Sequence, residues 1–216
     1  MENSNSKVAI VTGASSGIGY ATSIALLKAG VRVAVGARRL DRLQQLKKQI
    51  VKNGGEGKED EEEIFIHRKL DVTSKSDCDS FVDTVVKKWG RVDILINNAG
   101  LMPLSYFKNS KVKEWERMID VNIKGVLYCT SAVIPYMIDK KSGHIVNISS
   151  VAGRIVFAGG SVYCATKHAI TALSEGLRKE LSPEYNIRVT CIEPGAVATE
   201  LLETITDESM SKFIET

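Results

Sequence analysis

Three residues in the middle of the chain could together move a proton. Tyr163 and Lys167 are spaced so that, in a helix over residues 161–181, they would lie one turn apart on the same face. A lysine ammonium beside a phenol favours the phenolate and lowers the phenol pKa from about 10 toward the working range of a general acid. Ser150, arriving from the end of a different element, could hold the oxygen atom that is protonated. The pattern therefore indicates acid–base chemistry at an oxygen atom.

A glycine-rich turn near the N-terminus could bind an anion. The apolar run at residues 8–11 precedes Thr12-Gly13-Ala14-Ser15-Ser16-Gly17-Ile18-Gly19, and a helical pattern over residues 20–29 follows. Glycine lets the backbone approach a phosphate, while free N–H groups and the helix dipole favour negative charge. The spacing Gly-x-x-x-Gly-x-Gly departs from the Gly-x-Gly-x-x-Gly fingerprint of dinucleotide-binding turns. A tight turn without a ligand therefore stays open as an alternative.

Two arginines after the next predicted strand indicate which nucleotide would bind. A cofactor without a 2′-phosphate usually meets an acidic residue about 20 positions beyond the glycine turn. Arg38 and Arg39 occupy this neighbourhood, and the first carboxylate is Asp41. Fixed guanidinium donors suit a phosphate, which favours NADP over NAD. Alternatively, the two arginines begin a solvated basic helix face that Arg42 and Lys47 continue.

The elements that must position these groups alternate along the chain. Apolar runs predict strands at residues 8–11, 31–35, 64–70, 92–96, 143–150 and 187–192, and helices at 20–29, 40–52, 74–89, 111–119, 122–139 and 161–181. The acidic run at 56–63 predicts a surface loop. This alternation predicts an α/β fold, a Rossmann-like doubly wound parallel sheet with helices on both faces. The motifs follow the C-terminal ends of strands, which is the edge where such sheets bind ligands.

Some further residues allow two interpretations. The small residues of Asn97-Asn98-Ala99-Gly100 would let a flat ligand or another backbone pass close by. Asn122 is polar in a core-facing stretch, which fits a catalytic amide and a capping or helix-bending amide equally well. Met102, Phe157 and Leu202 could line a substrate pocket, but packing in the core or in a lid is the favoured interpretation.

The composition is that of a globular domain and argues against several function classes. The chain has 216 residues, 44% hydrophobic and 25% charged, with a formal net charge of +3, which predicts a single domain over residues 1–216. Its scattered basic residues argue against nucleic acid. The four cysteines have neither metal-ligand nor disulfide spacing, which argues against a metal site and fits a reducing, cytoplasmic location. A short polar start and no apolar run approaching about 20 residues argue against a membrane.

Together, the motifs resemble the short-chain dehydrogenase/reductase family over essentially the whole chain. They appear in the family's order and spacing: Thr12-Gly13-x-x-x-Gly17-Ile18-Gly19, Asn97-Asn98-Ala99-Gly100, Asn122, Ser150, Tyr163-x-x-x-Lys167 and Pro194-Gly195. The resemblance implies that Tyr163 is the acid/base, that Lys167 holds the nicotinamide ribose and lowers the tyrosine pKa, and that Ser150 polarises the carbonyl. It also implies that Asn122 supports a water chain from the active-site lysine to solvent.

The same resemblance implies an NADP site and no metal. The implied cofactor contacts are Gly13, Ser15, Gly17, Ile18, Gly19, Arg38, Arg39, Asp71, Val72, Asn98, Tyr163, Lys167, Pro194, Gly195, Val197 and Thr199. Family members associate through the two long helices, here residues 122–139 and 161–181, so a homodimer or homotetramer is expected.

The function that the resemblance implies is an NADP-dependent oxidoreductase acting on CH–OH groups, which interconverts a small alcohol and its carbonyl by hydride transfer. Residues 36–43 resemble the branch that acts on 3-hydroxy acids and serine-like substrates. One alternative is a non-catalytic NADP-binding sensor or regulator, which would not need Ser150, Tyr163 and Lys167. Another is a sugar-nucleotide epimerase or dehydratase on the same fold.

The C-terminal end is where the sequence departs from the family. Members normally continue and add a seventh strand, whereas six strands are visible here and Thr216 falls in what resembles a lid helix. The expectation is that the C-terminal end is incomplete, or that the protein lacks this strand. In the second case the sixth strand would be left with unpaired backbone groups.

Overall fold

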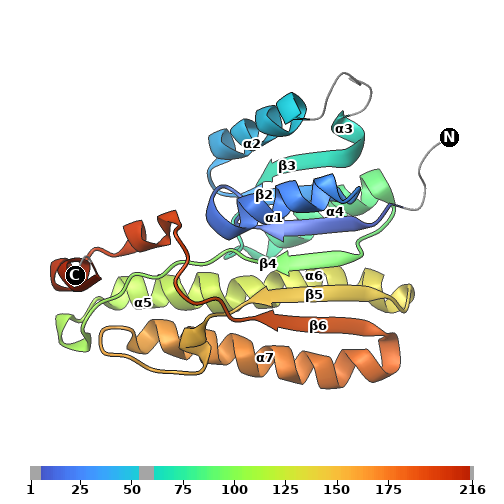
Figure 1. Ribbon diagram of the computed structural model, residues 1–216. Helices are drawn as coiled ribbons and strands as arrows, with labels where there is room; N and C mark the ends of the chain where they lie inside the picture. The colour runs from blue at the N-terminus through green and yellow to red at the C-terminus, as the bar shows by residue number, and fades with distance from the viewer. Residues whose placement is uncertain (1–5, 54–60, 215–216) are drawn as a thin grey trace.

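The computed structural model describes residues 6–53 and 61–214. They form a six-stranded parallel sheet in the order β3-β2-β1-β4-β5-β6 (Figure 1). The strands are β1 (Val8–Thr12), β2 (Arg32–Ala37), β3 (Phe65–Lys69), β4 (Ile94–Asn97), β5 (Gly143–Ile148) and β6 (Ile187–Ile192). The strand order reverses between β1 and β4, so the predicted doubly wound Rossmann-like sheet is confirmed.

Helices cover both faces of this sheet. On one face lie α1 (Gly17–Lys28) and α2 (Leu40–Asn53), and on the other α4 (Lys75–Trp89), α6 (Gly125–Asp139) and α7 (Ser161–Tyr185). The shorter elements are α3 (Glu61–Ile64), η1 (Phe107–Asn109), α5 (Val112–Ile119), the π-helical turn η2 (Asp120–Lys124), η3 (Val151–Gly153), η4 (Glu200–Thr204) and α8 (Glu208–Ile214). The arrowheads of all strands point to one side, where the C-terminal segment also lies (Figure 1).

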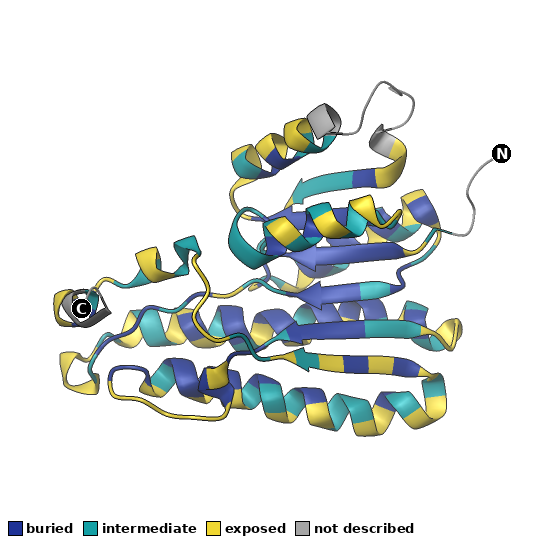
Figure 2. Cartoon of the chain, viewed as in Figure 1, coloured by how far each residue is buried: buried dark blue, intermediate teal, exposed yellow. Residues whose placement is uncertain are grey.

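Burial along the strands follows from this layering. Every residue of β1 is buried, as expected of a central parallel strand covered on both faces (Figure 2). In β6, Ile187 and Val189 are buried in the core that α7 covers, whereas Arg188 and Thr190 are exposed. Among the described residues β6 pairs on one side only, with β5, so it forms an edge of the described sheet.

The predicted boundaries are close to the observed ones, with some differences. Strand β5 ends at Ile148, so Ser149 and Ser150 lie in the following loop. Residues 61–63 were predicted to end a loop and Ile64 to begin a strand, but all four form the short helix α3. Strand β3 therefore begins at Phe65, one residue later than predicted. Residues 56–60 of the predicted acidic loop lie outside the described residues. Helix α7 continues to Tyr185, beyond the predicted end at residue 181, and Asn186 follows in the left-handed conformation that ends helices.

One helical run is longer and more apolar than the sequence analysis expected. Residues Val112–Asp139, comprising α5, η2 and α6, are long and apolar enough to cross a membrane by length and composition alone. In its most apolar window 44% of the residues are buried, and its side chains Val133 and Met137 belong to the core. The core helix of a soluble protein passes the same test, so this run is weak support for a membrane span.

Candidate active site

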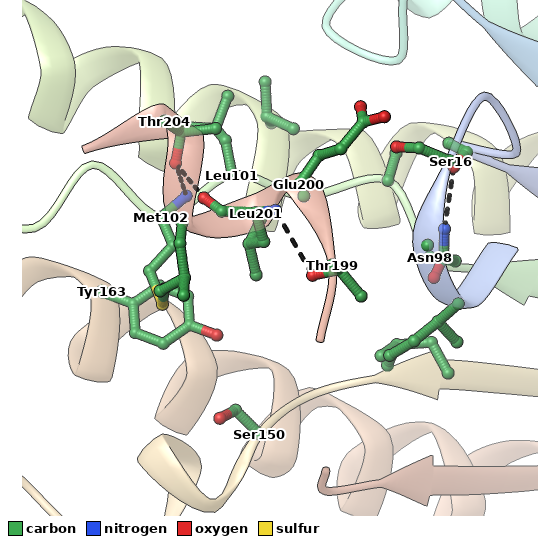
Figure 3. A pocket seen from close by; sticks show the side chains of 18 of the residues that line it. Ser16, Asn98, Leu101, Met102, Ser150, Tyr163, Thr199, Glu200, Leu201 and Thr204 are labelled. Atoms are coloured by element: carbon green, nitrogen blue, oxygen red, sulfur yellow. Dashed lines mark hydrogen bonds between the residues drawn. The ribbon is translucent and has the colours of Figure 1, made fainter. Parts of the chain in front are cut away.

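A cavity of about 910 Å³ opens at the C-terminal edge of the sheet. Its wall contains most of the residues that were predicted to be catalytic or to bind the cofactor: Gly13, Ser15, Gly17, Ile18, Arg38, Arg39, Asp71, Val72, Asn98, Ser150, Tyr163, Lys167, Pro194, Gly195, Val197 and Thr199. Gly19 and Asn122 are the two predicted residues that do not line it. Figure 3 shows Tyr163 and Ser150 on one side of the cavity and Ser16 and Asn98 on the other, with the η4 segment between them.

The glycine turn after β1 is shaped by close backbone approaches. Gly13 and Gly17 have φ angles of +66° and +58°, the left-handed region that glycine adopts without strain. A Cβ on Gly13 would lie 2.6 Å from the Cα of Ala99, so a side chain there would push the turn away from β4. A Cβ on Gly19 would collide with the amide of Asn98, so Gly19 serves the packing of α1 against the strands and does not line the cavity.

Thr12 ties the ends of β1 and β4 together at the point where the strand order reverses. Its Oγ1 accepts hydrogen bonds from the backbone N–H groups of Asn98 and Ala99, both at 3.1 Å. The Asn98 side chain donates in return to the carbonyls of Thr12 and Gly13, at 3.0 and 3.1 Å. Thr12 was not among the predicted site residues, although it stands directly before Gly13 in the sequence.

One end of the cavity carries a group of charges. Burial opposes ionisation of Asp71, but hydrogen bonds from Thr73 and the nearby charges of Arg38 and Arg117 hold the pKa of this carboxyl below its usual value. Arg117, on α5, also lines the cavity and was not among the predicted residues. Arg38 is exposed and makes no hydrogen bond or ion pair with the part of the chain that the structure describes.

Arg39 bridges three segments at the same end of the cavity. Its Nη2 donates to the hydroxyls of Ser15 and Ser16 at 3.1 and 2.8 Å, in the glycine turn. Its Nη1 donates to Glu200 Oε2 at 2.8 Å, and Arg42 Nη1 donates to the other oxygen of the same carboxylate at 3.0 Å. Neither Glu200 nor this contact was predicted from the sequence.

Tyr163 and Lys167 lie together on the first turns of α7, as the helical spacing predicts. Both are buried, and the Lys167 Nζ lies 5.7 Å from the centroid of the Tyr163 ring. Nζ donates to the carbonyl of Ile148 at 2.9 Å, at the end of β5. Ser150, in the loop beyond β5, accepts from the N–H of Ala152 at 3.1 Å and opens η3.

The pKa values of this pair differ from the prediction. Burial raises the pKa of the Tyr163 phenol, and the neighbouring Ser150 hydroxyl offsets this only in part. The pKa of Tyr163 is therefore raised and not lowered as predicted, because burial of the phenol disfavours its charged form. Burial instead lowers the pKa of Lys167 itself, from 10.5 to about 8.

Asn122 acts in the structure as a clamp between segments. It lies in the π-helical turn η2, and its buried side chain exchanges two hydrogen bonds with the backbone of Leu101, at 2.9 and 3.0 Å. Its Nδ2 also donates to Thr166 Oγ1 at 3.1 Å, and that hydroxyl donates to the Tyr163 carbonyl at 2.7 Å. These contacts hold the loop after β4 against the helix that carries Tyr163.

The apolar end of the cavity contains side chains that were expected to pack elsewhere. Met102, Phe157 and Leu202 line the cavity, and Met102 also packs against the core, so lining and packing are both found. The η4 segment is attached here because Thr204 Oγ1 accepts from the Met102 N–H at 3.1 Å (Figure 3). The cavity therefore joins a charged end to an apolar end, with the Tyr163 hydroxyl directed into it.

Comparison with known proteins places this arrangement in a family. Residues 7–210 match the short chain dehydrogenase family. The chain is similar to an uncharacterized oxidoreductase of Staphylococcus saprophyticus, with 47% identity over 216 residues, 100% of this chain and 84% of that protein. Both matches cover the glycine turn and the Tyr163 helix.

Among solved structures with the same fold, one contains NADP+ and another contains NAD. A closed form of serine dehydrogenase complexed with NADP+ is 35% identical with a TM-score of 0.84, covering 95% of this chain and 80% of that chain. A short chain dehydrogenase/reductase from Burkholderia phymatum in complex with NAD is 26% identical, also with a TM-score of 0.84, covering 94% of this chain and 70% of that chain.

Proposed function

Because this chain belongs to the short-chain dehydrogenase family, we propose that it is an NADP-dependent oxidoreductase that interconverts a small alcohol and its carbonyl compound at a CH–OH group. The observation that carries the proposal is the convergence, in one cavity, of the glycine turn, two arginines and the side chains of Ser150, Tyr163 and Lys167. A protein that only sensed the nucleotide would need the turn and the arginines but not the other three side chains.

The residues at the buried end of the cavity have the groups that carbonyl reduction requires. The Tyr163 Oη would donate its proton to the carbonyl oxygen while the Ser150 Oγ holds that oxygen. When bound, NADPH supplies the hydride. With a pKa of about 8, Lys167 is charged at neutral pH, and its ammonium near the Tyr163 ring would stabilise the phenolate left behind.

The proposed choice of NADP depends on the charged end of the cavity. The glycine turn lines the cavity and leads into the N-terminus of α1 at Gly17, where free N–H groups and the helix dipole would favour a pyrophosphate. Arg38 and Arg39 line the cavity beyond this turn and would hold a 2′-phosphate. The similarity to serine dehydrogenase complexed with NADP+ supports this choice.

The apolar end suggests the kind of substrate. Met102, Leu104, Val151 and Phe157 line the cavity together with Tyr163. We propose a small alcohol or carbonyl compound with an apolar portion beside the reacting carbon, with 3-hydroxy acids among the candidates.

The test follows NADPH absorbance with the purified protein and a panel of ketones, aldehydes and 3-oxo acids, with NADH in parallel. Tyr163→Phe should lower kcat/KM by at least about a hundredfold, the effect of losing a general acid. Tyr185→Phe is the matched control, because Tyr185 lies on the same helix but outside the cavity wall. Retention of most activity by Tyr163→Phe would contradict the assigned chemistry, and tight NADPH binding without turnover would favour the sensor.

We also propose that the protein is cytoplasmic and associates at least as a homodimer through α6 and α7. The four cysteines, which are free thiols in the structure, are compatible with a reducing compartment. Leu127 on α6 is an exposed large apolar side chain of the kind that an interface covers. Sedimentation of the purified protein tests the association.

A further inference from the structure

Glu200 stands where the charged end of the cavity meets the η4 segment. Its carboxylate pairs with two arginines at once, Arg39 at 2.8 Å and Arg42 at 3.0 Å. Arg39 directly precedes α2 and Arg42 lies in its first turn, whereas Glu200 is the first residue of η4. This double ion pair therefore joins the loop after β2 and the start of α2 to the η4 segment. Figure 3 shows Glu200 on η4, next to Thr199.

The contact uses donors that a 2′-phosphate would need. The remaining described contacts of Arg39 are with the hydroxyls of Ser15 and Ser16 in the glycine turn. Because Nη1 already donates to the carboxylate, a phosphate that binds Arg39 must either replace Glu200 or bind beside a like charge. A phosphate monoester has the advantage in this competition, since it carries up to two negative charges and three acceptor oxygens.

We propose that Glu200 determines cofactor specificity by occupying the arginine donors until a 2′-phosphate displaces it. The inference rests on the proposed NADP dependence. It adds a residue, Glu200, whose carboxylate weakens the binding of NADPH. NADPH would replace the carboxylate on Arg39 and Arg42, whereas NADH, which lacks the 2′-phosphate, would leave the ion pairs in place.

Displacement would also release one end of η4. At its start, Thr199 Oγ1 accepts from the Leu201 N–H at 3.3 Å, and Glu200 is the residue that connects this end to α2. The other end stays attached through the hydrogen bond between Thr204 and Met102. The 2′-phosphate would thus free the part of η4 nearest the nucleotide while the part over the apolar end keeps its anchor.

The first measurement compares the dissociation constants of NADPH and NADH for the wild-type protein and for Glu200→Gln. The variant should bind NADPH about tenfold more tightly, because the competing charge is gone, and NADH with an affinity within about twofold of the wild type. Glu203→Gln is the matched control, since Glu203 is an exposed carboxylate in the same η4 segment without an ion pair among the described residues. It should leave the ratio of the two affinities unchanged.

Three results would overturn the inference. Weaker NADPH binding by Glu200→Gln would show that the carboxylate positions the arginines for the phosphate. Equal changes for NADPH and NADH, or the same change in Glu203→Gln, would show a general effect on η4. These outcomes differ from a failure of the proposed function: a wild-type protein that prefers NADH would contradict the proposed cofactor, while a selective gain of NADPH affinity in Glu200→Gln would still support displacement.

A second measurement needs no substrate. Adenosine 2′,5′-bisphosphate should increase amide hydrogen exchange in residues 200–202 of the wild-type protein, and adenosine 5′-monophosphate should not. In Glu200→Gln these amides should already exchange faster and respond little to either nucleotide. Protection of residues 200–202 by the bisphosphate in the wild-type protein would overturn the displacement.

Discussion

Replacing Lys167 by methionine should stabilise the folded protein at pH 7 while abolishing its proposed activity. The lysine is 8% exposed, and burial lowers its pKa from 10.5 to about 8. At about 1.4 kcal/mol per pH unit, this difference means that the folded state carries the charged amine at a cost of about 3 kcal/mol. Methionine keeps the length of the side chain but loses the hydrogen bond to the Ile148 carbonyl, which offsets about 1 kcal/mol. The expected net gain in free energy of unfolding at pH 7 is about 2 kcal/mol.

The pH dependence of this stability gain shows whether it arises from the buried charge of Lys167. The unfolded chain binds a proton on Lys167 below about pH 10.5, and the folded chain binds it only below about pH 8. Between these values the unfolded state binds more protons, so the wild-type free energy of unfolding rises with pH. The advantage of the methionine variant should therefore be full below pH 8 and disappear as the pH approaches 10.5.

Thermal and urea denaturation of the protein without nucleotide, at several pH values from 7 to 10.5, measure this difference. A gain of about 2 kcal/mol corresponds to a rise in Tm of roughly 4–8 °C for a domain of this size. Lys179→Met is the control, because this lysine is on the same helix with a side chain 75% exposed, and its effect should not vary in this way. A methionine variant at position 167 that is less stable at pH 7, or whose advantage is the same at every pH, would refute the reasoning.

Three other variants test the charged end of the cavity and the contacts that support the cavity wall. Replacing both Arg38 and Arg39 by glutamine should weaken NADPH at least tenfold more than NADH, since each charge-assisted contact contributes about 1.5–3 kcal/mol; equal losses in titrations with the two nucleotides would exclude phosphate recognition. Asn122→Ala removes three hydrogen bonds and leaves buried partners unpaired, so denaturation should show a loss of about 2–3 kcal/mol, and an unchanged stability would contradict the clamp. Gly13→Ala forces a side chain to within 2.6 Å of Ala99 at a positive φ, so it should lower stability by about 2 kcal/mol and weaken both nucleotides; wild-type affinity would show that the turn can relax.

The sequence was sufficient to predict strands, helices and turns, because these depend on neighbouring residues. Apolar runs separated by helical patterns placed six strands correctly within a few residues, because strand and helix periodicities are local properties. The pairing of Tyr163 with Lys167 follows from helical spacing alone. Gly13 and Gly17 could be placed in a tight turn because their conformation is governed by the absence of a side chain.

The sequence was not sufficient to predict properties that depend on burial, such as the pKa values of side chains. From the sequence alone, Lys167 is a positive charge one helical turn from a phenol, which predicts a lower pKa for Tyr163. In the folded protein both groups are buried, so desolvation raises the pKa of the tyrosine and lowers that of the lysine. Met102, Phe157 and Leu202 were similarly ambiguous, because an apolar side chain in a cavity wall and one in the core have the same sequence signal.

The sequence by itself determined the order of the elements, the position of the glycine turn and the spacing of Tyr163 and Lys167. Only the tertiary structure decided which side chains from distant segments contact one another. Arg39 and Glu200 are 161 positions apart in the chain, and Asn122 is 44 positions from Thr166, so neither contact leaves a periodic trace in the sequence. Such contacts, and the pKa values that burial changes, arise from packing between distant segments, whereas helices, strands and turns are set largely by residues within a few positions of one another.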